Sequence, residues 1–281
     1  MTSTSPVALI TGVSSGIGTA IAVRLASAGF RVVGTSRAPQ RLTPIPGVET
    51  LALDVTDDTA VRSVVSEVID RTGHIDVLVN NAGLGIAGAA EESSIAQARS
   101  LFDTNFFGLI RLTNEVLPHM RRRGSGRIIN ISSVLGFLPA PYAALYAASK
   151  HAVEGYTESL DHELREYGVR ALLVEPSYTR TDFESNMWEA DTPQAAYADN
   201  RSAVRAVMTD KIRNAELPTV VADATYAAAT DKRIKLRYPA GRHARQLALL
   251  KRIAPAAVLD NGIRKQNGLN SPRSAPVPAG R

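Results

Sequence analysis

VALITGVSSGIG, at residues 7–18, is the stretch that decides the fold. Its first five residues are apolar or β-branched and predict a buried strand, and a helical pattern begins at Gly16. Glycines in a turn between strand and helix let the backbone approach a pyrophosphate, whose charge the first N–H groups of the helix can meet. Such a turn is also common as plain structure, so its place in the first strand–helix unit is what favours a dinucleotide site. The residues assigned to that site are Thr11, Gly12, Ser14, Ser15, Gly16, Ile17 and Gly18.

Strand and helix patterns alternate from this stretch to about residue 238. The predicted strands lie at 7–11, 31–35, 49–53, 75–80, 127–132, 170–175 and 235–238. The predicted helices lie at 16–28, 56–71, 95–122, 146–167 and 219–229. Several strands are continuous apolar runs, as strands covered on both faces are. The alternation predicts an α/β, Rossmann-type doubly wound parallel sheet of about seven strands in a single domain.

We expect this domain to carry two additions. Residues 1–240 are predicted to form the dinucleotide-binding and catalytic Rossmann domain, with a substrate lid inserted at about 182–218. Residues 241–270 are predicted to be a C-terminal helical extension. Residues 271–281 contain three prolines and no apolar cluster, so a disordered tail is expected there.

The composition is that of an ordinary globular protein, with 281 residues of which 44% are hydrophobic and 21% charged. There is no cysteine, which excludes disulfides and thiolate metal sites and fits a reducing cytoplasm. The five histidines show no metal-ligand spacing, so no metal is expected. No charged start precedes the apolar N-terminal run, and no apolar run is long enough to span a bilayer. A soluble, cytoplasmic protein without a transmembrane segment is therefore expected.

Charge is unevenly spread along the chain. The formal net charge is +5, but residues 201–281 hold 16 Lys or Arg against 5 Asp or Glu. A basic end can bind nucleic acid or an anionic membrane surface. No nucleic-acid motif accompanies it, so a solvated helix face with a charged tail is the favoured interpretation, and no nucleic-acid partner is expected.

The end of the second predicted strand distinguishes the two nicotinamide cofactors. NAD sites usually carry an acid there for the ribose 2′-hydroxyl, whereas an arginine accommodates a 2′-phosphate. Ser36 and Arg37 stand at this position and the next acid is Glu49, so NADP(H) is predicted. A solvated loop arginine is the alternative. Further cofactor contacts are predicted where the third and fourth strands end, at Asp54, Val55, Asn81, Ala82 and Gly83.

Tyr146 and Lys150 lie four residues apart and therefore on one face of a predicted helix. A phenol titrates near ~10. A neighbouring ammonium, together with a positive nicotinamide ring, favours the phenolate and is predicted to lower the pKa of Tyr146. Tyr146 is then suited to give a proton to a carbonyl oxygen or to take one from an alcohol. A Tyr-x-x-x-Lys pair alone is often only a helix surface. Ser133, at the end of the fifth strand, can orient the substrate oxygen, and Asn105 can hold a water that links Lys150 to solvent.

Together these motifs resemble the short-chain dehydrogenase/reductase family, from about residue 7 to residue 238. The matching residues are the turn at 11–18, Asn80-Asn81-Ala82-Gly83, Asn105, Ser133, and Tyr146 to Lys150, in the family's order and spacing. The resemblance implies a carbonyl/alcohol oxidoreductase whose catalytic tetrad is Asn105, Ser133, Tyr146 and Lys150. It also implies that Lys150 binds the nicotinamide ribose.

The resemblance extends to the tract after the sixth strand. It implies that Pro176, Thr179 and Thr181 contact the cofactor, with Thr181 at the carboxamide. Ser177 departs from the pattern, because the family usually has glycine there. Its side chain is expected to narrow the nicotinamide pocket, which puts the affinity or pose of the cofactor in question.

The chain looks most similar to the hydroxysteroid-dehydrogenase-like branch of the family, which implies a hydrophobic substrate of steroid, lipid or aromatic type. Phe183, Met187 and Trp188 in the insertion fit an apolar binding wall, although ordinary packing explains them equally well. The resemblance also implies a homodimer or homotetramer.

Two other functions stay open at this point. One is a non-enzymatic NADP-binding sensor on the same fold, which needs the glycine turn but not the tetrad. The other is a nucleic-acid or membrane-surface module driven by the basic end, whose binding would fall steeply with salt.

Overall fold

The computed structural model of the protein describes residues 5–183 and 186–269, and its centre is a parallel sheet of seven strands. The strands of this sheet are β1 (Val7–Thr11), β2 (Arg31–Ser36), β3 (Val48–Ala52), β4 (Val77–Asn80), β6 (Gly126–Ile131), β7 (Val169–Pro176) and β9 (Arg237–Ala240). They pair in the order β3-β2-β1-β4-β6-β7-β9, so the chain reverses its direction of winding between β1 and β4. The predicted Rossmann-type doubly wound fold is confirmed. The 271–281 tail lies outside the described residues.

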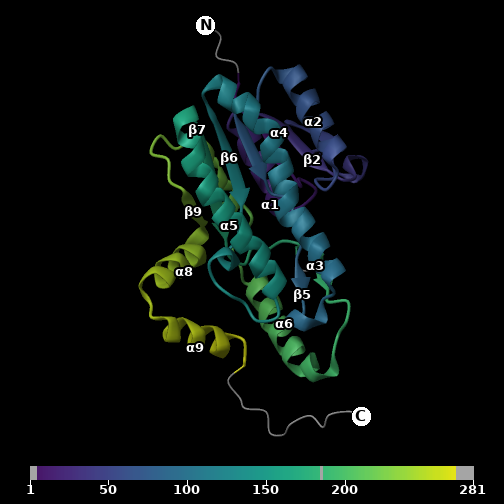
Figure 1. Ribbon diagram of the computed structural model, residues 1–281, viewed down its shortest axis with the longest axis vertical. Coiled ribbons are helices and arrows are strands. Elements are labelled where there is room, and N and C mark those ends of the chain that lie inside the picture. The colour runs from purple at the N-terminus through teal and green to yellow at the C-terminus, as the bar shows by residue number, and fades with distance from the viewer. Residues whose placement is uncertain (1–4, 184–185, 270–281) are drawn as a thin grey trace.

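Helices cover both faces of the sheet (Figure 1). The helices are α1 (Gly16–Ser27), α2 (Asp58–Thr72), α3 (Ile95–Phe102), α4 (Gly108–Arg123), α5 (Ala144–Leu164), α6 (Ala198–Arg213), α7 (Thr219–Thr230), α8 (Gly241–Ile253) and α9 (Ala256–Gln266). On one face α1 and α7 pack with strand residues such as Ile10 and Leu172 in one apolar core. On the other face α2, α4 and α5 pack against residues such as Leu9 and Ile128 in a second core. Strands buried on both faces explain the continuous apolar runs in the sequence.

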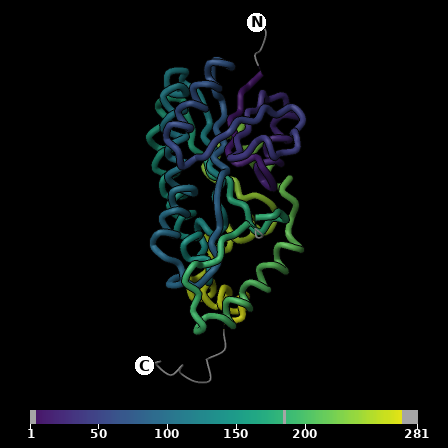
Figure 2. The backbone as a smooth tube through the Cα atoms, turned by 90° about the vertical axis from the view of Figure 1, so that its right-hand side faces the viewer, coloured from purple at the N-terminus to yellow at the C-terminus, as the bar shows by residue number. Residues whose placement is uncertain are grey.

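The carboxyl ends of the strands point into the lower half of the molecule as drawn, where the later segments gather (Figures 1 and 2). A short parallel pair, β5 (Ile86–Ala87) with β8 (Trp188–Glu189), ties the chain after β4 to the segment that follows β7. Helix α6 follows β8, and α8 and α9 follow β9. These elements therefore face the edge of the sheet at which doubly wound folds bind ligands.

One predicted helix differs from the structure in a way that matters for the site. The pattern at 95–122 predicts a single helix, but α3 and α4 are joined by a π-helical turn at Asp103–Phe107. Its i→i+5 geometry is seen at the N–H of Gly108, which donates to the carbonyl oxygen of Asp103. The extra residue in this turn brings Asn105, 2% exposed, to the interior. Within the described ranges, no helix is both long enough and apolar enough to cross a bilayer.

Candidate active site

A pocket of about 970 Å³ lies along the carboxyl ends of the strands, and residues from 177 to 212 form part of its wall. Its volume is at the upper end of the range for small-molecule and cofactor sites. Most of the predicted site residues line it: Gly12, Ser14, Ser15, Gly16, Ile17, Gly18, Ser36, Arg37, Asp54, Val55, Asn81, Ala82, Gly83, Ser133, Tyr146, Lys150, Pro176, Thr179 and Thr181. Thr11 and Asn105 lie behind this wall and line a second, small cavity.

The glycine turn is packed so closely that it leaves no space for side chains. Gly12 has φ +71°, and a Cβ there would lie 3.0 Å from the Cα of Ala82. A Cβ on Gly18 would lie 2.0 Å from the carbonyl oxygen of Gly12. Helix α1 begins at Gly16, and the side chain of Ser15 makes no capping hydrogen bond to it. Bare backbone and an uncapped helix N-terminus at the pocket wall fit a pyrophosphate.

Thr11 and Asn81 brace this turn from behind. The hydroxyl of Thr11 accepts hydrogen bonds from the backbone N–H groups of Asn81 and Ala82, each at 3.0 Å. The side-chain amide of Asn81 donates to the carbonyl oxygens of Thr11 at 2.9 Å and Gly12 at 3.0 Å. These bonds join the ends of β1 and β4 at the point where the strand order reverses, and they hold the turn in shape.

The pocket is basic beyond the end of β2. Arg37 and Arg41 both line it and both are exposed, and the side chain of Ser36 accepts a hydrogen bond from the N–H of Ala38. Burial alone would raise the pKa of the Asp54 carboxyl. Hydrogen bonds from Thr56 and the charges of Arg37 and Arg111 outweigh burial and lower that pKa. Arg41 was missed at the level of sequence, although its position four residues after Arg37 is a usable signal.

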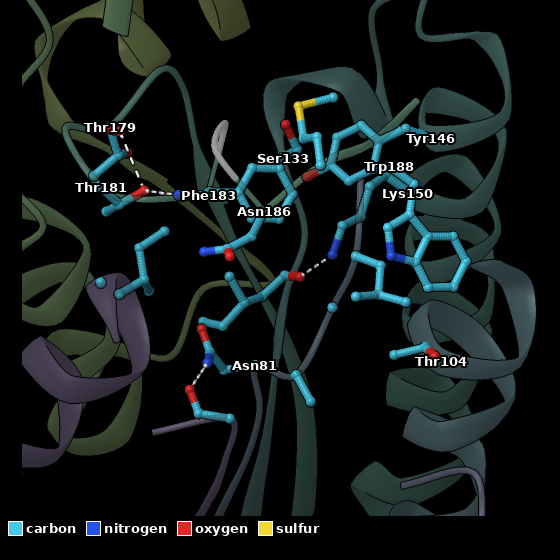
Figure 3. Close-up of a pocket in the computed structure, with 18 of the residues that line it drawn as sticks. Asn81, Thr104, Ser133, Tyr146, Lys150, Thr179, Thr181, Phe183, Asn186 and Trp188 are labelled. Atoms are coloured by element: carbon cyan, nitrogen blue, oxygen red, sulfur yellow. Dashed lines mark hydrogen bonds between the residues drawn. The ribbon is translucent and has the colours of Figure 1, made fainter. Parts of the chain in front are cut away.

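Ser133, Tyr146 and Lys150 come together on one side of the pocket, and Thr179 and Thr181 lie on the other (Figure 3). Ser133 follows β6, and α5 carries both Tyr146 and Lys150. The hydroxyl of Ser133 lies near enough to the phenol of Tyr146 to oppose the rise in its pKa. The ammonium of Lys150 lies 5.8 Å from the centre of the Tyr146 ring and donates to the carbonyl oxygen of Ile131 at 2.9 Å. A serine hydroxyl, a phenol and an ammonium thus share one end of the pocket.

In the protein by itself, burial sets the direction of the Tyr146 pKa. Burial raises the pKa of Tyr146 to about 12, and the hydroxyl of Ser133 only partly opposes it. Burial also lowers the pKa of Lys150 to about 8, while the charge of Glu154 acts in the opposite direction. The prediction that Lys150, together with a bound nicotinamide, lowers the pKa of Tyr146 concerns the complex and stays a prediction. In the protein by itself desolvation of the phenolate dominates, and the nearby ammonium of Lys150 is directed at a backbone carbonyl.

Asn105 is held next to Lys150 rather than in the main pocket. Its side chain accepts from the N–H of Leu84 at 2.7 Å and donates to the Leu84 carbonyl oxygen at 2.9 Å. It also donates to the hydroxyl of Ser149 at 3.1 Å. The small cavity that Asn105, Lys150 and Thr11 line measures about 10 Å³, roughly the space that one water molecule needs.

Ser177 is held by the C-terminal part of the chain. Its hydroxyl lies 2.8 Å from Nδ1 of His243 on α8, so the side chain that replaces the family's glycine has a partner on that helix. Thr181 lies across the pocket against the glycine turn, since a Cβ on Gly16 would meet its side chain at 3.1 Å.

The 182–218 segment supplies an apolar wall. Phe183, Met187 and Trp188 line the pocket, and the Phe183 ring lies 5.9 Å from that of Tyr146. Helix α6 has no buried residue, yet one of its faces lines the same pocket, through Arg201, Val204, Arg205, Met208 and Ile212. The α6 residues were missed at the level of sequence, because only their 3–4 residue spacing on an otherwise polar helix hints at such a face.

Comparison with known proteins agrees with this fold and this site. The profile of the family described as "short chain dehydrogenase" matches residues 6–192. An uncharacterized oxidoreductase of Bacillus subtilis is 34% identical over 275 residues, which cover 92% of this chain and 98% of that protein. A 3-ketodihydrosphingosine reductase of Bacteroides thetaiotaomicron is 44% identical over 178 residues, which span 63% of this chain and 65% of the reductase. The match to that reductase thus covers just under two thirds of its length.

Solved structures give the same result. A short-chain dehydrogenase from Streptomyces avermitilis aligns over 96% of this chain and 100% of its own, with a TM-score of 0.80 and 33% identity. A Burkholderia phymatum member in complex with NAD has a TM-score of 0.75 at 27% identity, covering 96% and 98% of the two chains. An actinorhodin polyketide ketoreductase with NADPH has a TM-score of 0.69 at 30% identity, covering 83% and 94%.

The chain belongs to the short-chain dehydrogenase/reductase family. It is therefore an oxidoreductase of the carbonyl/alcohol class that uses a nicotinamide cofactor. The structural relatives include both NAD and NADPH complexes, so the family alone leaves the choice between the two cofactors open.

Proposed function

We propose that this protein is an NADP(H)-dependent oxidoreductase that interconverts a carbonyl and a secondary alcohol on a hydrophobic substrate, as in the hydroxysteroid-dehydrogenase-like branch. The observation that carries the proposal is the convergence of Ser133, Tyr146 and Lys150 at one end of the pocket that the glycine turn lines (Figure 3). A bound nicotinamide would supply or accept the hydride. The remaining chemistry is the positioning of one oxygen and the movement of one proton, and this chain has groups for both.

Tyr146 is the general acid in the direction of reduction. With its pKa raised to about 12, the phenol keeps its proton at neutral pH and can donate it to a carbonyl oxygen that gains negative charge. The hydroxyl of Ser133, which lies against the phenol, orients the same oxygen. In oxidation Tyr146 takes the proton back, which requires that its pKa fall. Positive charge next to the phenol, from Lys150 and a bound nicotinamide, would lower the pKa of Tyr146 in this way.

Lys150, with a water held by Asn105, returns a proton to Tyr146 after it has donated its own. Lys150 is 6% exposed and would hold the nicotinamide ribose as well. The small cavity between Asn105, Lys150 and Thr11 takes about one water molecule, which is what a relay from the lysine needs. The hydrogen bonds of Asn105 to Leu84 fix its side chain at the wall of this cavity.

NADP(H) rather than NAD(H) is supported by the charges beyond β2. Arg37 and Arg41 offer two guanidinium groups, and arginine is suited to a 2′-phosphate because its fork of donors can bind two oxygens at once. Asp54, on the next strand connection, is ionised and lies near enough to Arg37 to be influenced by its charge.

A hydrophobic substrate is supported by the wall opposite the glycine turn. Phe183, Met187 and Trp188 line the pocket next to Tyr146, and Val204, Met208 and Ile212 of α6 continue this surface. An apolar helix face that lines the pocket is suited to a ligand of similar character. The 3-ketodihydrosphingosine reductase among the relatives is named for a substrate of this kind.

A panel of ketones tests the proposal. The purified protein should oxidise NADPH, seen as a loss of its absorbance, in the presence of apolar ketones of steroid, long-chain or aromatic type. Met208→Glu should raise KM for these ketones without weakening NADPH binding. Turnover of small polar sugars with no activity on any apolar ketone would refute the substrate class. No turnover of any ketone or alcohol, with NADPH bound, would favour the sensor.

A further inference from the structure

A cluster of carboxylates lies directly behind the proposed catalytic lysine. Glu154 follows Lys150 by four residues on α5, Glu175 lies on β7, and Arg237 lies on β9. Arg237 makes ion pairs with Glu154, with Glu175 and, at 2.7 Å, with Glu158. The side chains of Glu154 and Glu175 are only 5% and 1% exposed, whereas that of Glu158 is 45% exposed. The single guanidinium of Arg237 thus forms ion pairs with two buried carboxyl groups and with one at the surface.

The two buried carboxyl groups hold more potential negative charge than Arg237 can neutralise. Burial first, and then the charge of Glu154, raises the pKa of Glu175 to about 7. Burial also raises the pKa of Glu154, against the opposing effects of Ser132 and Arg237. Near neutral pH the pair therefore shares a proton across Arg237. One of the two buried carboxyl groups is then charged, and it lies against the guanidinium of Arg237.

Glu154 is the acidic group that acts on Lys150. Glu154 follows Lys150 by four residues, so the two lie on the same face of α5, and both are buried there. The phenol of Tyr146, the carbonyl oxygen of Ile131 and the amide of Asn105 also lie around Lys150, and none of these three carries a formal charge at neutral pH. The charge of Glu154 opposes the effect of burial on Lys150.

The carboxylate is also enclosed beneath the loop that carries Ser133. A Cβ on Gly136 would lie 2.6 Å from the hydroxyl of Ser132 and 2.7 Å from Oε1 of Glu154. The loop after β6 thus closes over Glu154 without space for a side chain. This loop encloses Glu154 from one side, and Arg237 binds its carboxylate from the other.

We propose that Glu154 is a positioning residue for the reaction: its enclosed carboxylate, shared with Glu175 through Arg237, keeps the ammonium of Lys150 charged at neutral and mildly alkaline pH. The effect on turnover rests on the proposed function, but the effect on Lys150 concerns this chain alone. The charge matters because a neutral Lys150 would neither favour a phenolate at Tyr146 nor return a proton to it.

The titration of Lys150 can be followed directly by NMR. The chain has six lysines, and Lys150 is the only buried one, so protein labelled with 13C at lysine Cε gives few signals. Lys150→Arg identifies the signal of interest, and the other five lysines serve as internal controls. In the wild type the Lys150 signal should titrate near pH 8.

Glu154→Gln should move this titration down by about one pH unit, a tenfold change in the protonation equilibrium that corresponds to about 1.4 kcal/mol. Glu158→Gln is the matched control, because it removes a carboxylate from the same helix and the same arginine, one turn further from Lys150. It should leave the titration in place, and Glu154→Asp should restore most of the wild-type value. An unshifted signal in Glu154→Gln, or an equal shift in Glu158→Gln, overturns the proposal.

Turnover gives the second readout. The pH at which kcat falls on the alkaline side should move down in Glu154→Gln by the same amount as the NMR titration, and it should not move in Glu158→Gln. A uniform loss of kcat at every pH, with the NMR signal unshifted, would show that Glu154 is only structural. If the wild type has no turnover, the proposed function fails while the NMR result still decides the role of Glu154.

Discussion

Replacing Arg37 and Arg41, the two arginines beyond β2, should shift the cofactor preference from NADPH toward NADH. Arg37 and Arg41 line the same end of the pocket, and both are exposed. A hydrogen bond to a charged group contributes about 1.5–3 kcal/mol, and solvent screening at an exposed site favours the lower figure. Each Arg→Ala change should therefore weaken NADPH binding about tenfold, and the double variant about a hundredfold if the two act independently.

Binding of the two cofactors to the same variants separates this effect from general damage. Kd would be measured by nicotinamide fluorescence for NADPH and NADH, at low and at high salt. NADH lacks the 2′-phosphate, so its Kd should change less than about threefold, and the loss for NADPH should shrink at high salt because an exposed charge pair is screened. Equal losses for both cofactors would refute the assignment of these arginines to a phosphate.

Three further outcomes follow from the geometry. Gly18→Ala places a Cβ 2.0 Å from a backbone oxygen, so NADPH affinity should fall more than tenfold and Tm should drop. Thermal melts measured with and without NADPH would contradict this if they matched those of the wild type. Glu175 has a pKa raised from 4.5 to about 7, so its stabilising contribution is complete below pH 4.5 and is lost as the pH rises to 7, by up to about 3 kcal/mol. Glu175→Gln should flatten that decline in urea unfolding, and identical pH profiles for variant and wild type would argue against it. Ser177→Gly removes the contact with His243, so NADPH affinity should change while Tm moves little, and an unchanged Kd would show that this contact does not shape the cofactor site.

The features that sequence predicts well are local ones. The glycine turn at 11–18 and the apolar strands carry their own backbone requirements, so the fold follows from them in chain order. Tyr146 and Lys150 share a helix, and their approach follows from a spacing of four residues. These features needed no knowledge of contacts between distant segments.

The features that escape the sequence depend on distant packing. The π turn brings Asn105 to the interior through one extra residue, which the periodicity at 95–122 does not reveal. The raised pKa of Tyr146 comes from the protein packed around the phenol, whereas the sequence shows only the neighbouring lysine. The apolar face of α6 lines the pocket through contacts with distant segments, among them the pairing of β5 with β8 and the ion pair of Arg201 with the buried Glu92.

The central claim is that Tyr146 moves the proton on a substrate oxygen beside a bound nicotinamide. Tyr146→Phe tests it most directly, with NADPH binding and reduction of an apolar ketone measured on the same preparation. The account predicts that Kd for NADPH stays within about twofold while kcat falls by about 10²–10⁴. Turnover that stays at the wild-type rate with the phenol removed would contradict it.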